Sequence, residues 1–257
     1  MAKRRLLCAW SAAMSAAMLA VSTPALAQAP AATPGHVSWY GDPKAPDISG
    51  AWVRVDEPAA GGRSHEGWTP FPPPLKGKFA EIWKKRVADA AAGTRTDDPI
   101  RACLPPGMPR FMTGMTTPML ILQTPGRVMI YRDGLPVRRI WLDGRPQPDA
   151  RDMEMFFSGN AMGRYEGQDL VTDVRGLRDQ PIDSTGIPHS DDLQIAEHIH
   201  RVDAKTLRVE VILTDKTAYT RPMKTVVTYR QVDDPLWEPH ELLCTPEKAY
   251  HAENYVK

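Results

Sequence analysis

The stretch His189–Val202, HSDDLQIAEHIHRV, alternates in a way that is typical of a β-strand with one buried face. Successive side chains of a strand point to opposite faces of the sheet. One row therefore contains Leu193, Ile195, Glu197, Ile199 and Arg201, and the other contains Gln194, Ala196, His198 and His200. A carboxylate in the apolar row is costly unless it is paired, hydrogen-bonded or protonated. We therefore expect Glu197 to lie beside a cation or to be held protonated, and both arrangements suggest a lined pocket.

Short β-rich segments separated by turn residues surround this strand. Strands are predicted at Gly50–Val55, Pro118–Gln123, Arg127–Arg132, Pro136–Leu142, Asp169–Arg175, Asp192–Val202, Leu207–Asp215 and Met223–Gln231. Hairpin turns are predicted at Thr124-Pro125-Gly126, Asp133-Gly134 and Asp143-Gly144. Apolar residues at helical spacing predict one amphipathic helix from Leu75 to Gly93. The fold class is therefore mainly β, an antiparallel β-barrel with one amphipathic helix, with a β-sandwich as the alternative.

The first 27 residues have the features of a secretion signal. Lys3, Arg4 and Arg5 precede an apolar and small-residue run, and Ala25-Leu26-Ala27 fits the small-x-small cleavage rule. We expect a signal peptide over 1–27, a flexible leader over 28–49, a single β-rich domain over 50–244 and a C-terminal tail over 245–257. The expected location is periplasmic or secreted.

Charge and hydropathy exclude two classes of partner. Loss of the signal changes the formal charge from +1 to about −2, and no basic stripe suited to nucleic acid remains. The mature chain has no run of about 18 apolar residues, so we expect no stable membrane insertion after cleavage. The expected partner is a small molecule, and the oligomeric state stays open.

Two cysteines, Cys103 and Cys244, remain after the signal is removed. In an oxidising compartment an even pair predicts a disulfide, which for so long a loop stabilises by roughly 5 kcal/mol in the chain-entropy model. Two buried free thiols are the alternative interpretation.

Four motifs together resemble a large family of exported bacterial proteins. They are RACLPPGMPR at 101–110, RRIWLDGR at 138–145, GRYEG at 163–167 and PHSD at 188–191. The likeness covers about Asp47 to Cys244 and implies export and a common fold, but it transfers no activity. The family pattern has Trp where Tyr165 stands and lacks imidazoles at His198 and His200, so it does not place these two histidines in a shared site.

The start of the first predicted strand, Gly50-Ala51-Trp52, is similar to the Gly-x-Trp of lipocalins and other calycins. In that family an arginine from a late strand packs on the tryptophan, and Arg230 is the corresponding candidate here. The likeness implies a barrel of about eight strands that encloses room for one small ligand. We expect Trp52 at the closed end of this barrel.

Several residues are candidates for a site. Because Arg138 and Arg139 are adjacent on a strand, one of them must point inward, where it can pair with Glu197. That pair is either a buried structural ion pair or the lining of a ligand cavity. Four aromatic residues are expected to line the sheet interior, namely Tyr131, Trp141, Tyr165 and Tyr229.

Histidines provide the remaining candidates. His189, with Asp191 two residues later, lies in a loop at the predicted barrel mouth and suits a general acid or base, or else it bonds local backbone groups. His198 and His200 share a strand face, but no third ligand follows at a persuasive spacing, so we predict that they face solvent and that no metal is bound.

Two functions follow from these candidates. The first is an exported barrel that binds a small apolar or aromatic molecule without turnover, using Arg138, Arg139, Tyr131, Trp141, Tyr229 and Asp191. The alternative is a small periplasmic lyase, isomerase or hydrolase in which His189 and Glu197 act as acid and base. Neither interpretation includes a cofactor, because the sequence carries no cofactor motif.

Overall fold

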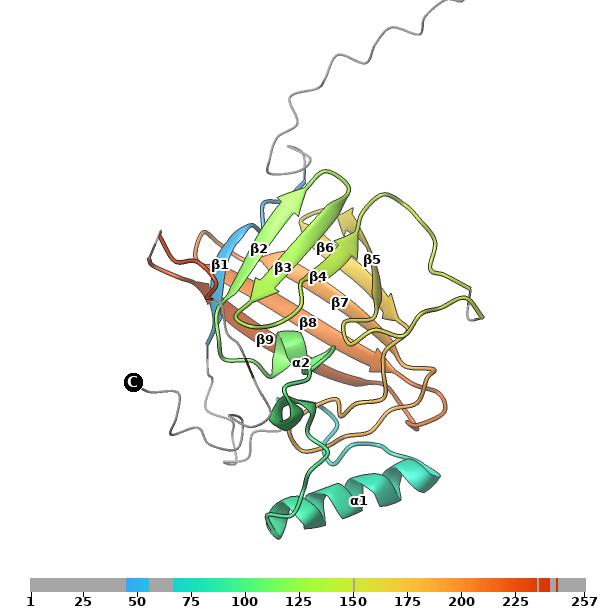
Figure 1. The fold of residues 1–257 in the computed structure, drawn as a ribbon. Helices are drawn as coiled ribbons and strands as arrows, with labels where there is room; N and C mark the ends of the chain where they lie inside the picture. The colour runs from blue at the N-terminus through green and yellow to red at the C-terminus, as the bar shows by residue number, and fades with distance from the viewer. Residues whose placement is uncertain (1–44, 56–66, 150, 235, 241–243, 245–257) are drawn as a thin grey trace, which may run out of the picture. The chain divides into compact units, whose positions relative to one another are not determined.

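Nine strands form a closed barrel in the computed structural model, which describes residues 45–55, 67–149, 151–234, 236–240 and 244. The strands follow one another round the barrel in sequence order, and the last pairs with the first (Figure 1). Their bounds are β1 Gly50–Arg54, β2 Met119–Thr124, β3 Arg127–Arg132, β4 Arg138–Trp141, β5 Asn160–Glu166, β6 Asp169–Arg175, β7 Gln194–Arg201, β8 Thr206–Thr214 and β9 Met223–Gln231. The predicted β-barrel is confirmed, and the alternative of a β-sandwich is wrong.

One strand pair departs from the antiparallel pattern. β4 and β5 run parallel, with Ile140 opposite Ala161, because the chain returns to the starting end of the barrel before β5 begins. Asp143-Gly144, predicted as a hairpin turn, instead starts this return. β5 was not predicted, since its sequence NAMGRYE contains no β-branched residue. Its Gly163 is required by packing, because a Cβ there would lie 2.7 Å from the side chain of Ile140.

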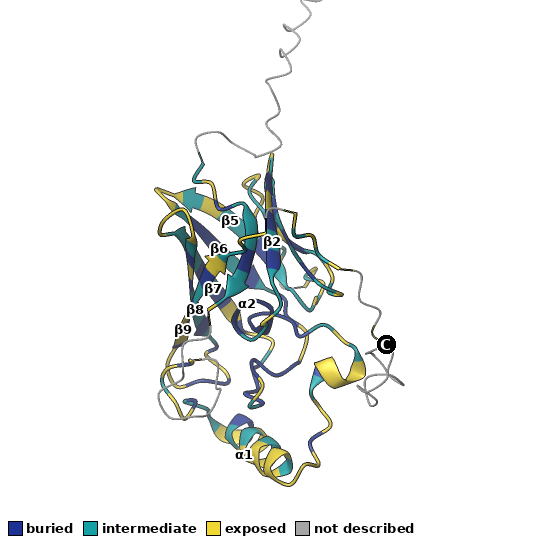
Figure 2. Cartoon of the chain, turned by 90° about the vertical axis from the view of Figure 1, so that its left-hand side faces the viewer, coloured by how far each residue is buried: buried dark blue, intermediate teal, exposed yellow. Residues whose placement is uncertain are grey.

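The predicted helix is confirmed as α1, Gly77–Ala91, within about two residues at each end. Two short elements were not predicted, the 3₁₀ helix Pro99–Ala102 and the single turn α2, Arg110–Thr113. A single turn shows no hydrophobic period in sequence. α1 buries only Phe79 fully, and Figure 2 shows exposed residues along most of its length.

The two ends of the barrel differ in their connections. At the hairpin end, the turns 124–127, 166–169 and 201–206 join neighbouring strands directly. At the loop end, the longer segments 67–118, 176–193 and 215–222 extend beyond the strands and include α1 and α2 (Figure 1). The motifs RACLPPGMPR and PHSD both lie at the loop end.

Side chains close the hairpin end around Trp52, as expected. The indole Nε1 donates to the carbonyl of Ile48 at 3.1 Å, and Ile48 N–H donates to Gln123 Oε1 at 2.8 Å. Arg201 lies over the indole ring at 5.4 Å from its centre. The prediction that Arg230 takes this place is wrong, since Arg230 is exposed and pairs with Asp233.

Ile48 is fully buried, so the barrel fold begins before Gly50, within the last residues of the predicted leader. The predicted signal peptide, the rest of the leader and the predicted tail lie outside the described residues. The described part of the chain contains no helix whose length and hydropathy suit a membrane span.

Cys103 and Cys244 form the predicted disulfide, with their Cα atoms 5.5 Å apart. The bond joins the segment between α1 and α2 to the part of the chain that follows β9. It therefore closes a loop that contains nearly the whole barrel.

Candidate functional site

Glu197 and Arg138 form an ion pair inside the barrel, which confirms the predicted pairing. Arg138 reaches from β4 to β7, three strands further round the sheet, and its Nη1 donates to Glu197 Oε1 at 3.1 Å. Its Nη2 donates to Oε2, which also accepts a bond of 2.6 Å from the Thr172 hydroxyl. All three residues are at most 1% exposed. Arg139 points to the outer face and is exposed, so Arg138 is the inward member of the adjacent pair.

Both oxygens of Glu197 are bonded to groups of the barrel interior, and the residue is fully buried. A buried pair of this kind is strongly destabilised when one partner is removed, because the other charge is then left without compensation. The geometry therefore assigns Glu197 and Arg138 to the barrel core.

The four aromatic residues expected to line the interior divide between the two faces. Tyr131 alternates with the buried Ile130 and Arg132, and Trp141 follows the buried Ile140, so both aromatics lie on the outer face. The prediction that Tyr131 and Trp141 line the interior is therefore wrong. Arg145 stacks on the Trp141 ring at 3.8 Å from its centre.

Tyr165 and Tyr229 are the two that point inward. The Tyr165 hydroxyl accepts a bond of 2.7 Å from Gln123 at the hairpin end. Tyr229 is fully buried near the loop end, where it donates to the carbonyl of Met112 in α2. Burial raises the pKa of Tyr229, although the charge of Arg132 opposes the rise, and the neutral hydroxyl serves to fix α2 against the barrel.

The PHSD motif lies in the segment 176–193, and residues of the β8–β9 connection hold it from one side. The Tyr219 hydroxyl donates to the carbonyl of Pro188 at 3.0 Å. The Asp215 carboxylate accepts from the N–H and the hydroxyl of Ser190, at 2.7 and 2.8 Å, and from the N–H groups of Thr217 and Ala218. Burial, with the charges of Asp215 and Asp183, raises the pKa of Tyr219 well above its usual value, so its hydroxyl remains a donor.

The preceding part of the segment is held by Asp183, which is fully buried. Its carboxylate accepts bonds from the N–H groups of Thr185, Gly186 and Ile187 and from the Thr185 hydroxyl. Burial raises the pKa of Asp183 above its ordinary value, and these bonds oppose that rise.

α1 is bonded both to the β8–β9 connection and to the segment 176–193. Lys76, at the start of α1, donates its N–H to the carbonyl of Ala218, and Arg86 donates from Nη1 to the carbonyl of Gly186 at 3.1 Å. Arg86 also pairs with Asp97; burial raises the pKa of Asp97, but the bonds and charges of Arg95 and Arg86 bring it below its usual value. The PHSD motif is thus held by the β8–β9 connection, and α1 is bonded to that connection and, at Gly186, to the segment that contains the motif.

Within this well-bonded segment, His189 keeps one ring nitrogen without a partner. The residue is 5% exposed, and its Nδ1 lies 2.7 Å from the carbonyl oxygen of Ser190. Because a carbonyl oxygen only accepts, we assign a ring hydrogen to Nδ1, and Nε2 is then the ring nitrogen without a partner. Nε2 is buried and has no partner among the described residues. A buried polar atom left without a bond costs about 1–3 kcal/mol, and Gln180 Oε1 of the same segment is another such atom.

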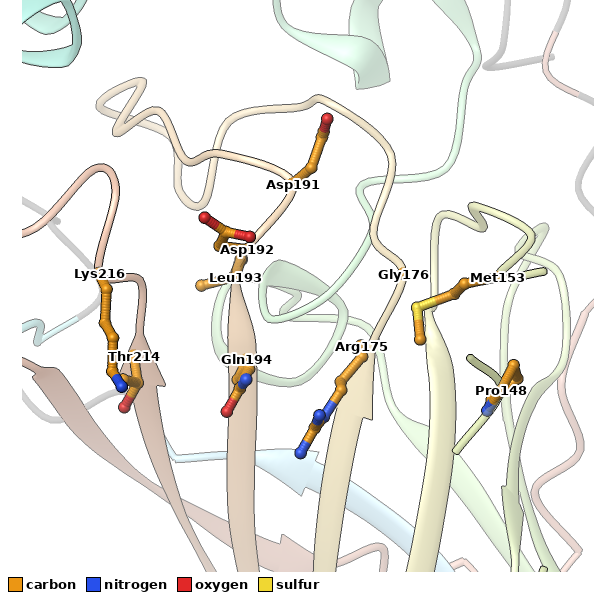
Figure 3. A pocket seen from close by; sticks show the side chains of 10 residues that line it. All are labelled: Pro148, Met153, Arg175, Gly176, Asp191, Asp192, Leu193, Gln194, Thr214 and Lys216. Atoms are coloured by element: carbon orange, nitrogen blue, oxygen red, sulfur yellow. The ribbon is translucent and has the colours of Figure 1, made fainter. Parts of the chain in front are cut away.

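Two clefts flank the PHSD motif. The first, here called the helix cleft, has a volume of about 480 Å³ and lies between α1 and the motif, where His189, Asp179, Asp191, Lys78, Phe79 and Ile82 are among the residues that line it. The second, here called the strand cleft, has a volume of about 420 Å³. Figure 3 shows Arg175, Gln194 and Lys216 at the ends of the neighbouring strands, with Met153 and Pro148 across from them. Asp191 and Asp192 line both clefts.

His189 and Glu197, predicted to act together, are not brought together. Glu197 is bonded only within the barrel interior, whereas His189 belongs to the helix cleft, and the two share no hydrogen-bond partner among the described residues. Asp191, in contrast, lines the same cleft as His189.

His198 and His200 are half-exposed on the outer face of β7, where His200 Nδ1 lies 2.5 Å from Asp169 Oδ1. No group of three histidine, cysteine or acidic residues in the described part of the chain has a geometry that holds a metal ion.

Comparisons of the chain with protein-family models, with curated proteins and with solved structures found no match. The function is therefore argued from the geometry of the loop end.

Proposed function

We propose that this protein is an exported β-barrel that binds a small polar molecule in the helix cleft, without turnover. The observation that carries the proposal is the helix cleft itself, a space of about 480 Å³ that has His189, Asp179 and Asp191 in its wall. This volume lies in the range of about 300–1,000 Å³ that is usual for small-molecule sites. The signal features of residues 1–27 and the disulfide support export.

The charged lining of the helix cleft favours a polar ligand over the apolar or aromatic ligand expected from the sequence. The sequence suggested a ligand site inside the barrel. The side chains there, such as Arg138, Trp52 and Tyr229, are fully buried and expose no surface to a ligand. His189 and Glu197 lie in separate parts of the structure, and this does not support an enzyme in which they act together as acid and base. Ser190 is not available as a nucleophile activated by His189, since its hydroxyl donates to Asp215.

The test is to identify small molecules that co-purify with the protein and to block the cleft. Ile82→Trp fills the helix cleft, and Val226→Trp is the matched control, because Val226 is similarly exposed (43% against 38%) on the outer face of β9. A compound detected by mass spectrometry in the wild type and in Val226→Trp, and lost in Ile82→Trp, supports the proposal. No enriched compound, or one retained in Ile82→Trp, contradicts it.

A further inference from the structure

We propose that the outer face of β2, β3 and β4 is a docking surface for an acidic partner protein, a role that goes beyond ligand binding in the helix cleft. Its main residues, here called the arginine–aromatic face, are Leu122, Arg127, Met129, Tyr131, Arg139 and Trp141. Arg139 and Trp141 belong to the motif RRIWLDGR, no part of which lines the helix cleft.

The strand register brings these side chains together in rows across the sheet. In one row, Leu122 pairs with Met129, and Met129 pairs with Arg139. In the next row, Arg127 pairs with Trp141. Side chains that are paired in this way have Cβ atoms about 4.5–5.5 Å apart. Leu122 and Arg139 are exposed and the others are partly exposed. In Figure 1, α1 and α2 both lie at the loop end, so neither helix covers this surface.

The composition of the arginine–aromatic face is unusual for the outside of a barrel. Outward residues of an antiparallel sheet are commonly polar, as on β7, where they include Gln194, His198 and His200. On β2, β3 and β4 they are mainly apolar, aromatic or arginine, and none of them is a carboxylate or a lysine. Aromatic residues, methionine and arginine are enriched in protein–protein interfaces, whereas lysine, glutamate and aspartate are depleted. The face therefore has the composition of a protein interface.

The charge of this face is positive. The side chains of Arg127 and Arg139 form no ion pair or hydrogen bond with a described residue, and Arg127 lies over the Trp141 ring at 4.9 Å from its centre. Arg145 also stacks on this ring, but it pairs with Asp143. Two guanidinium groups are thus left without a counter-charge among the described residues, and a partner with carboxylates would complement them.

The partner that fits has carboxylates beside apolar side chains. A second copy of the chain, docked through the same face, would place arginines against arginines, which is destabilising. Because two guanidinium groups already stack on Trp141, less side-chain freedom is lost when this residue docks. Trp, Tyr and Arg are also the residues that most often dominate the binding energy of an interface.

Four sets of short synthetic peptides separate charge from apolar content: acidic with apolar residues, acidic without them, basic with apolar residues, and uncharged with apolar residues. Fluorescence anisotropy with the purified mature protein should show that the acidic–apolar set binds at least tenfold more tightly than any other. Arg139→Glu and Trp141→Ala should each weaken this binding about tenfold or more. Arg208→Glu, the same charge reversal at an exposed position on the outer face of β8, should leave the affinity unchanged.

Arg139→Glu keeps the test independent of folding, because the Arg139 side chain is exposed and makes no bond to a described residue. Equal binding of the acidic peptides with and without apolar residues would show only non-specific attraction and would overturn the proposal, as would absence of binding by all four sets. Binding to phosphatidylglycerol vesicles without peptide binding, or dimerisation in sedimentation velocity, would also overturn it if Arg139→Glu abolishes the effect. None of these outcomes affects the proposed function, since no residue of the face lines the helix cleft.

Discussion

The barrel interior and the segment 176–193, which contains the PHSD motif, both bury polar groups, but they differ in how these groups are hydrogen-bonded. Inside the barrel, Glu197 accepts bonds from Arg138 and Thr172 at both oxygens. At the loop end, Asp183 and Asp215 are equally well bonded, yet His189 beside them keeps Nε2 without a partner next to a cavity. The Glu197 carboxylate, bonded at both oxygens inside the barrel, therefore indicates a structural role, although Arg138 Nε has no partner among the described residues. His189 is distinguished by its place in the wall of the helix cleft.

The largest loss of stability is expected from Glu197→Ala. It leaves the Arg138 guanidinium buried without a counter-charge and should lower the free energy of unfolding by about 3–5 kcal/mol, measured by urea denaturation. Glu210→Ala, on the outer face of the adjacent strand β8, is the control and should stay within about 0.5 kcal/mol of the wild type. Equal effects of the two substitutions would show that the interior pair is not structural.

The disulfide should have the next largest effect. Cys103→Ala should lower the free energy of unfolding by about 2–4 kcal/mol without changing ligand affinity, since neither cysteine lines the helix cleft. Intact mass of exported protein should show a chain that begins at Gln28 with both thiols oxidised. Labelling of both thiols in freshly exported protein would refute the pairing.

Asp215→Asn tests whether the PHSD segment is held from outside. Loss of the charged acceptor should lower stability by about 1.5–3 kcal/mol and speed hydrogen exchange at the amides of Ser190, Thr217 and Ala218. Asp192→Asn is the control, because Asp192 is exposed and accepts bonds from one hydroxyl only. If hydrogen exchange at the Ser190 amide is the same in both variants, Asp215 does not hold the PHSD motif.

Asp183→Asn should change the pH dependence of stability. Burial raises the pKa of Asp183 in the folded state above its ordinary value of 3.8. The contribution of this group to the free energy of unfolding is therefore fully present below pH 3.8 and is lost as pH rises through the higher folded-state pKa. An asparagine keeps an oxygen for the N–H groups of Thr185, Gly186 and Ile187 and does not titrate. The variant should therefore gain stability relative to the wild type as pH rises above about 4. If the free energies of unfolding of the variant and of the wild type change in parallel with pH across this range, the assignment is wrong.

The sequence predicted those parts of the fold that depend on local alternation. The pattern of β7 predicted a buried carboxylate and therefore a cation beside it, but only the register shows that Arg138 and not Arg139 provides it. β5 was not predicted because Gly163 and Arg164 interrupt the alternation of apolar and polar residues along the strand. The outward orientation of Tyr131 was available from the sequence, because it lies in the opposite row from Val128 and Ile130.

The candidate site was predicted only in part. His189 and Asp191 were predicted from the motif, whereas Asp183, Asp215 and Tyr219 were missed. Asp215 and Tyr219 lie about 25–31 residues from their partners in the motif, and their contacts depend on loop conformations that leave no periodic signal. Asp183, followed by Ser-Thr-Gly, did carry a signal, since aspartate before such residues commonly bonds the backbone two or three residues later.

The central claim is that binding depends on His189 and not on the Glu197 pair. The most direct measurement is the affinity of the co-purified ligand for His189→Ala and for Glu197→Gln, determined together with the free energy of unfolding of each variant. We predict at least tenfold weaker binding by His189→Ala with a stability loss of about 1 kcal/mol or less, and unchanged affinity with lower stability for Glu197→Gln. Loss of affinity in Glu197→Gln, with normal binding by His189→Ala, would contradict the account.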